Sequence, residues 1–168
     1  MIRPILTLLV LLLFLLMPAC TSPQRVSDER AVAMKRAKVE AVLRSWHLAA
    51  SQGLFEDYFD TMTGDAVFLG TDPGERWRKD EFMAYAREPF ADGDGWTYEP
   101  IDTRVALSRD ATVAWTDELL EHELYGVLRG TGVLEQVEGQ WKIAHYSLTF
   151  LVPNEDIADL LEMKRRTD

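Results

Sequence analysis

Residues 96–152 alternate between apolar and polar side chains with a period of two, and three breaks interrupt the pattern. The breaks fall at 108–110, around 125–126 and at 138–140, where glycine and charged residues gather. Because successive side chains of a strand point to opposite faces, this pattern predicts four consecutive antiparallel strands joined by turns. A chain with such a sheet must cover at least one of its faces.

The last of these strands is apolar on both faces. One face carries Trp141, Ile143 and His145, and the other carries Tyr146 and Leu148. A sheet with one solvated face alternates more cleanly, so the second face must be covered by more of the chain or by a second subunit. We therefore expect a homodimer.

Helical patterns precede the sheet. Apolar residues recur at helical spacing over Ser27–Ser51 and again over Leu54–Met62, and a glycine follows each segment. A strand at 65–70 comes next, and a third helix is expected from about Asp80 to Pro89. Helices followed by an antiparallel sheet indicate an α+β fold in which the helices close one side of the sheet.

A C-terminal helix is predicted at 155–168. Asn154 is a suitable N-cap, and Ile157, Leu160 and Leu161 are expected to face inward.

The N-terminus has the features of an export signal. Arg3 precedes the apolar run Ile5–Met17, which is too short to span a membrane, and Ala19 is followed by Cys20, the only cysteine. This order predicts a bacterial lipoprotein signal at 1–19, with Cys20 lipidated after cleavage. The alternative is an incidental thiol behind an ordinary secretory signal.

These features give a division of the chain. We expect a flexible tether at 20–27 and one folded domain at 28–154, exported to the bacterial cell envelope and anchored to a membrane through the lipid on Cys20. The formal net charge of −10 argues against nucleic acid as a partner, because nucleic-acid binding needs clustered basic residues.

Many short blocks between Val39 and Asn154 form a family-specific pattern. They include Trp46-His47, Asp65-Ala66-Val67-Phe68-Leu69-Gly70-Thr71-Asp72, Glu75-Arg76-Trp77, Gly95-Trp96-Thr97-Tyr98, Val113-Ala114-Trp115, Asp117-Glu118-Leu119-Leu120, Arg129-Gly130-Thr131-Gly132-Val133-Leu134 and Trp141-Lys142-Ile143-Ala144-His145-Tyr146. In these blocks the chain resembles the SnoaL-like branch of the nuclear transport factor 2-like superfamily, which includes ketosteroid isomerase. The resemblance implies a cone-shaped roll, with N-terminal helices packed on a curved, mostly antiparallel sheet around a pocket.

Aromatic residues are the candidates for the pocket wall, since small-molecule sites are mostly apolar. The expected ligand-binding residues are Trp46, Tyr58, Phe68, Trp77, Trp115 and Arg129. In this set the arginine could hold an anionic ligand or pair with a neighbouring carboxylate.

Asp117 and His145 are the candidate catalytic residues. If the face that Asp117 shares with Trp115 looks into the cone, burial would raise the pKa of the carboxyl and make it a usable base. The alternative is an ion pair with Arg129. His145 shares the face of Ile143, which is expected to point inward.

The other two histidines have weaker signals. His47 could lie on either side of the pocket mouth, and His122, between Glu121 and Glu123, is expected at the surface. No short metal-ligand spacing, phosphate-binding loop or nucleophile elbow is present in the sequence, so we expect neither a metal nor a cofactor.

Three functions remain after this reasoning. The first is binding of a small, largely apolar molecule without chemistry. The second is an isomerase-like or lyase-like enzyme that transfers a proton in the pocket. The third is a structural dimer in an envelope complex. Fold alone does not choose among them.

Overall fold

The computed structural model describes residues 23–91, 93 and 95–167. The predicted signal at 1–19 and the predicted lipidation site Cys20 lie outside the described residues. Contacts divide the chain into two units, Met1–Met34 and Lys35–Asp168. None of the described helices is both long enough and apolar enough to cross a membrane.

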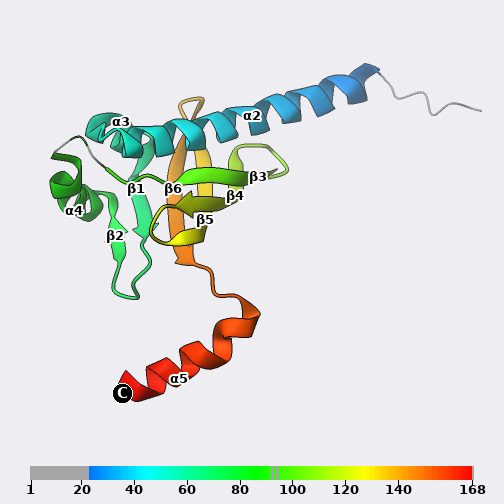
Figure 1. Cartoon of the computed structure of the whole chain (residues 1–168). Helices are drawn as coiled ribbons and strands as arrows, with labels where there is room; N and C mark the ends of the chain where they lie inside the picture. Colours follow the sequence, from blue (N-terminus) through cyan, green and yellow to red (C-terminus); the bar gives the residue numbers. More distant parts are fainter. Residues whose placement is uncertain (1–22, 92, 94, 168) are drawn as a thin grey trace, which may run out of the picture. The chain divides into compact units, whose positions relative to one another are not determined.

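The second unit is built on one six-stranded sheet with the order β2-β1-β6-β5-β4-β3 (Figure 1). The elements in chain order are α2 (Pro23–Ser51), α3 (Phe55–Asp60), β1 (Met62–Leu69), β2 (Arg76–Arg78), α4 (Lys79–Ala91), β3 (Glu99–Leu107), β4 (Val113–His122), β5 (Gly126–Val137), β6 (Gln140–Phe150), the 3₁₀ turn η2 (Asn154–Asp156) and α5 (Ile157–Thr167). All neighbouring strands are antiparallel except β1 and β6, which are parallel. The predicted α+β fold and its four consecutive strands are confirmed.

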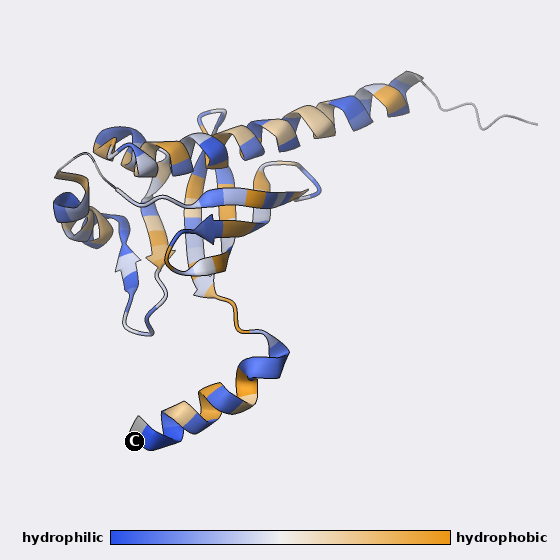
Figure 2. Ribbon diagram, viewed as in Figure 1, coloured by the Kyte–Doolittle hydropathy of each residue, from blue (hydrophilic) through white to orange (hydrophobic). Residues whose placement is uncertain are grey.

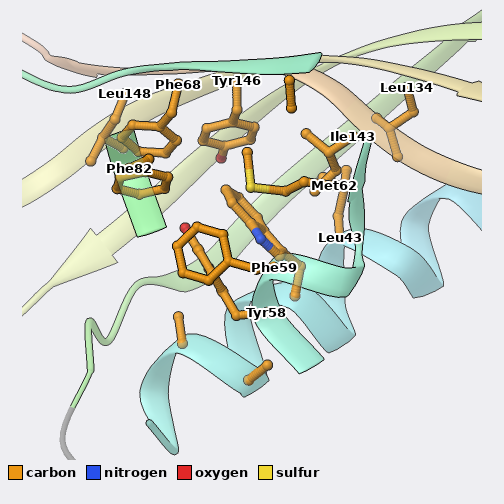
Figure 3. Packing of buried hydrophobic residues seen from close by; sticks show 14 of the residues in the cluster. Leu43, Tyr58, Phe59, Met62, Phe68, Phe82, Leu134, Ile143, Tyr146 and Leu148 are labelled. Carbon is orange, nitrogen blue, oxygen red and sulfur yellow. The ribbon is translucent and has the colours of Figure 1, made fainter. Parts of the chain in front are cut away.

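The core lies between the inner face of the sheet and the helices. From α2, Val39, Leu43 and Trp46 are buried, and from the sheet Leu134 and Tyr146 meet them. Figure 3 shows Leu43 of α2 together with Leu134 and Tyr146 of the sheet in one cluster, which is rich in aromatic rings. Burial of this cluster supplies most of the stability of the unit, because each large apolar side chain contributes about 1.5–3 kcal/mol when fully buried.

The start of α2 differs from the prediction. The helix begins at Pro23, so residues 23–27 are helical and do not belong to a flexible tether. Proline is well tolerated in the first turn of a helix, where the missing N–H has no partner inside the helix.

Helix α4 does not stop at Pro89, which lies inside it. The helix ends only two residues later. The ring of the next residue, Phe90, is buried and packs against Tyr58 and Trp96 at centroid distances of 5.4 and 5.1 Å. This packing holds the last turn in place although proline removes one backbone donor.

Strand β6 contains a bulge at Ala144. Leu134 of β5 pairs with Ile143, whereas the preceding Val133 pairs with His145, so Ala144 is an extra residue. A bulge shifts the alternation by one position. Ile143 before the bulge and Tyr146 after it therefore both face the core.

This bulge changes the interpretation of the two apolar faces. The expectation that a second subunit covers the far face of β6 assumed unbroken alternation, and that assumption is wrong.

Helix α5 carries a row of apolar residues that stay outside the core, visible in Figure 2 as orange bands between blue ones. Ile157 and Leu161 are exposed, and the largest set of contacts from α5 is with η2. The expectation that this face turns inward is wrong. Asn154 also begins η2 itself, and Pro153 occupies the N-cap position without a side-chain cap.

Candidate functional site: an aromatic pocket over a buried carboxylate

A pocket of about 500 Å³ lies in the second unit, between the inner face of the sheet and helices α2 to α4. Eleven of its twenty lining residues are phenylalanine, tyrosine or tryptophan, and two are histidine. Such a lining favours a largely apolar ligand with a few defined polar contacts.

One wall of the pocket is a set of nearly parallel rings. The Phe82 ring is tilted by only 5° from Trp96 and 13° from Trp77, and Tyr85 is tilted by 13° from Trp96. Phe68 continues the set at 14° from Phe82. Flat, parallel rings offer a planar ligand a stacked contact that a puckered ring cannot make.

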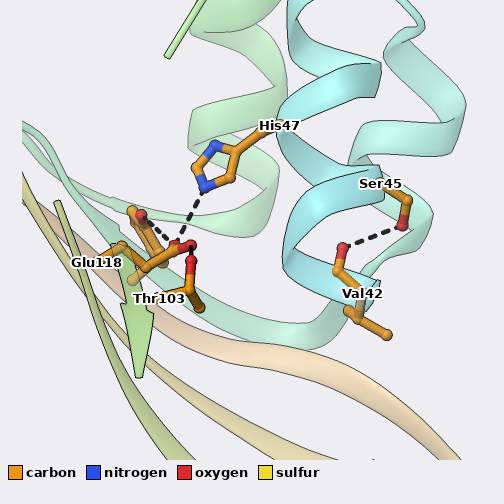
Figure 4. Close-up of polar contacts among 6 residues, drawn as sticks. Val42, Ser45, His47, Thr103 and Glu118 are labelled. Carbon is orange, nitrogen blue, oxygen red and sulfur yellow. Dashed lines mark hydrogen bonds and ion pairs between the residues drawn. The ribbon is translucent and has the colours of Figure 1, made fainter. Parts of the chain in front are cut away.

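Glu118 lies beneath the pocket with only 1% of its surface exposed. Its Oε2 is 3.1 Å from His47 Nε2 and accepts a hydrogen bond from the Tyr146 hydroxyl at 3.0 Å. Its Oε1 accepts one from the Thr103 hydroxyl at 2.9 Å. Figure 4 shows His47 reaching from α2 toward this carboxylate on β4. A buried carboxylate with three side-chain partners is well satisfied.

These partners decide the protonation state of the carboxyl. Burial raises the pKa of Glu118, but the hydrogen bond and charge of His47 and the hydroxyls of Thr103 and Tyr146 outweigh it and hold the pKa below its ordinary value. The group is therefore ionised at neutral pH.

His47 has its tautomer fixed by this carboxylate. An ionised carboxylate can only accept, so whenever the imidazole is neutral its proton lies on Nε2 and its lone pair on Nδ1. Among the described residues Nδ1 has no hydrogen-bond partner, and the ring lines the pocket. In that neutral form His47 presents one oriented acceptor that a ligand can use.

Two glycines make room for Tyr146. Gly130 and Gly132 lie on β5 opposite Glu118 and Thr116 of β4. A Cβ at position 130 would overlap the Tyr146 hydroxyl and approach Cζ to 2.7 Å, and a Cβ at position 132 would approach Thr116 Oγ1 to 2.9 Å. The absence of these side chains lets the tyrosine ring lie on the sheet and reach the carboxylate.

Three tyrosines of the pocket, Tyr58, Tyr98 and Tyr146, have a raised pKa. Burial, and then the charge of Glu118, raise the pKa of Tyr146 well above its usual value, and burial does the same for Tyr58. Burial also raises the pKa of Tyr98. These phenols are therefore hydrogen-bond donors throughout the physiological pH range.

Four of the six expected ligand-binding residues line the pocket: Trp46, Tyr58, Phe68 and Trp77. Trp115 and Arg129 do not. Both are on the opposite face of the sheet, where 51% of Trp115 is exposed.

The expectation that Asp117 faces the cavity is also wrong. Strand β4 turns Thr116 and Glu118 inward, and Asp117 between them is exposed. Asp117 shares the outer face of β4 with the exposed Trp115, whereas the inner face holds Ala114, Thr116, Glu118 and Leu120. The alternative ion pair is absent too: among the described residues no salt bridge joins Asp117 to Arg129.

His145 does not line the pocket because the bulge at Ala144 separates it from the inward-facing Ile143. It lies beside Val67 of β1 and Val133 of β5, on the outer side. Asp117 and His145 therefore share no cavity, and the proton-transfer hypothesis loses the two residues on which it was based.

His47, Glu118 and Tyr146 were not selected from the sequence as site residues. A usable signal was present in β4, where a glutamate follows Ala114 and Thr116 on one face. The spaced glycines of β5 opposite that face were the second signal.

Among the described residues no three histidine, cysteine, aspartate or glutamate side chains converge to hold a metal ion. The pocket polar groups are suited to hydrogen bonding.

Comparison with known proteins agrees with this architecture. The model of the SnoaL-like domain family matches residues 39–153, which is more than half of the chain. The chain belongs to the SnoaL-like family. No curated protein matches it.

Solved structures show the same fold at low identity. An NTF2-like protein of unknown function from Pseudomonas putida is 14% identical, with a TM-score of 0.61 over 73% of this chain and 91% of the other. A proposed dehydratase of the NTF2-like family from Streptomyces avermitilis is 17% identical, with a TM-score of 0.59 over 72% and 99%. A proposed scytalone dehydratase from Novosphingobium aromaticivorans is 14% identical, with a TM-score of 0.61 over 75% and 89%. The SnoaL-like domain described here thus has the cone fold of NTF2-like proteins.

Proposed function

We propose that this SnoaL-like domain binds a small, planar, largely apolar molecule in its pocket. The observation that supports it best is the wall of parallel rings around Phe82 and Trp96, in a pocket of about 500 Å³. A planar ligand extends this stack, and His47 Nδ1 accepts a hydrogen bond from its polar group.

Calorimetric titration with 2-naphthol and with trans-2-decalol tests this proposal. The two alcohols have similar carbon skeletons, but only the naphthol is flat. We expect the wild type to prefer 2-naphthol, and Trp96→Leu to weaken its binding about two- to tenfold, the worth of one aromatic contact. Trp115→Leu is the matched control on the outer face and leaves the affinity unchanged. Equal binding of both alcohols would contradict a planar site.

Proton transfer is a second candidate function, because His47 lines the pocket and its Nε2 is held by an ionised carboxylate, while Nδ1 has no hydrogen-bond partner among the described residues. That arrangement suits a general base acting on a C–H bond next to a carbonyl. NMR can follow deuterium exchange of 2-tetralone at saturating concentration. If the enzyme hypothesis holds, His47→Gln slows the exchange at least about a hundredfold. If the wild type does not accelerate the deuterium exchange, the enzyme hypothesis fails and ligand binding is the remaining function.

We also propose export and lipid anchoring through Cys20, as the N-terminal sequence predicts. The test is expression of the full chain in a bacterial host, followed by membrane fractionation and mass spectrometry. The wild type should sediment with membranes and carry an acylated Cys20, and Cys20→Ser should be released in soluble form. An unmodified wild type would refute the anchor.

Self-association through the outer face of the sheet is a further proposal, consistent with a dimeric, structural role in an envelope complex. Trp115 and Val133 are paired across β4 and β5 and are both exposed, and Ala106 of β3 extends the patch. Sedimentation analysis should show a dimer that Trp115→Lys dissociates. A monomeric wild type at high concentration would rule it out.

A further inference from the structure

His122 lies at the mouth of the same pocket, with one ring nitrogen already engaged. Its Nδ1 accepts hydrogen bonds from the backbone N–H groups of Leu124 and Tyr125, at 3.1 and 3.3 Å. The ring also stacks on Tyr125 at 4.4 Å and contacts Tyr98 at 5.0 Å. His122, expected at the surface, is thus half-buried and also lines the pocket.

These contacts fix the tautomer of His122. Two N–H groups aimed at Nδ1 require a lone pair there, so the proton of the neutral ring lies on Nε2. Nε2 has no hydrogen-bond partner among the described residues. His122 is therefore a donor, through Nε2, at the pocket mouth. Neutral His47 is an acceptor, through Nδ1, at the pocket floor, which is formed by His47, Glu118 and Tyr146.

Strand β4 places His122 four residues beyond Glu118, the carboxylate that contacts His47. Glu118, Leu120 and His122 follow one another on the inner face, and Glu118 binds His47. Four residues of a strand span about 13 Å. Two fused rings with a polar group at each end have a length that fits within this rise from Glu118 to His122.

We infer that His122 determines specificity by donating from Nε2 to an acceptor oxygen of the ligand. The ligand class is then a flat bicyclic compound with a hydroxyl at the end near His47 and a carbonyl or ether oxygen at the end near His122. This inference rests on the proposed binding function.

The experiment compares 2-naphthol with 6-acetyl-2-naphthol, which adds an acceptor at the far end. We expect the acetyl group to improve binding to the wild type about tenfold, as one added directed contact does. The variants separate the two nitrogens of His122. His122→Asn keeps an acceptor for the turn but has no donor at the Nε2 position, and His122→Gln places an amide N–H there.

The expected result is that the ratio of the two affinities falls from about ten in the wild type to about one in His122→Asn, while His122→Gln retains part of the acetyl gain. Amide NMR signals of Leu124 and Tyr125 report whether the turn is intact in each variant. If 2-naphthol binds but the acetyl gain is absent from the wild type, or persists in His122→Asn, this inference is overturned and the binding function stands. If neither naphthol binds the wild type, both are overturned.

Discussion

At the scale of single residues, the pocket floor depends on one carboxylate almost fully shielded from water. Glu118 is held by two hydroxyls and an imidazole, and it orients His47 for any ligand. Ionised groups are rarely buried without such partners, because desolvation is costly. Removing the charge therefore changes both stability and the state of His47.

Glu118→Gln should lower the free energy of unfolding by about 1–3 kcal/mol at neutral pH, because hydrogen bonds to a charged acceptor are lost in a buried place. The folded-state pKa of Glu118 is below its ordinary value of 4.5, so the carboxylate stabilises the fold above that pH. This stability is lost as the pH falls through the folded-state pKa. Urea unfolding at neutral pH and near pH 3 should show the gap between wild type and variant shrinking in acid. Glu121→Gln, an exposed change on the same strand, is the control, and a gap of constant size would contradict the assignment.

Gly130→Ala should destabilise the domain by about 1–3 kcal/mol, because the new methyl group would overlap Tyr146. Gly64→Ala is the matched control, since nothing lies within 4 Å of a Cβ at that position. Thermal unfolding of both variants measures the difference. Equal melting temperatures would show that the tyrosine can move aside easily.

At the scale of elements, the sequence predicted the strands well and their faces poorly. Period-two alternation is a local property, so β3 to β6 could be located without the fold. The extra residue Ala144 decides which side chains of β6 point to the core, and no residue type marks a bulge reliably. In β4 the choice of face depends on what packs above the strand, so the exposed Trp115 could not be distinguished from a core tryptophan by pattern alone.

Asp117→Asn and His145→Ala test the facing of β4 and β6. Both side chains are outside the pocket, so each variant should bind 2-naphthol with wild-type affinity and unfold within about 0.5 kcal/mol of the wild type. Tyr146→Phe, on the inner face of β6, removes the hydrogen bond from the tyrosine hydroxyl to Glu118 beneath the pocket. It serves as the contrasting variant. A large affinity loss in either outer variant would mean that these residues act on the pocket through the sheet.

At the scale of the whole molecule, the core of the second unit is complete before α5 begins. Aromatic pocket-wall residues such as Trp46 and Trp77 could be proposed from the sequence because small-molecule pockets are mostly lined by apolar and aromatic side chains. The polar floor could not be proposed, since it joins a helix to strands more than fifty positions away. Long-range pairs such as His47 and Glu118 are created by the fold alone.

A chain ending after Val152 should therefore unfold within about 0.5 kcal/mol of the full chain, because the apolar row of α5 is not buried in the core. A chain ending after Ser147 also loses the buried Leu148 and should be strongly destabilised. Chemical denaturation followed by tryptophan fluorescence compares the two. A large loss on removing α5 alone would show that the helix docks on the domain.

The space left free by Gly130 has an evolutionary consequence. Related sequences that carry a larger residue at this position should be destabilised if they also keep a tyrosine at position 146. Substitutions at the two sites should therefore arise together, with a shorter residue at 146 accompanying a longer one at 130. Lineages that made this exchange would have lost the tyrosine hydroxyl that donates to Glu118. We expect their pockets to bind different ligands.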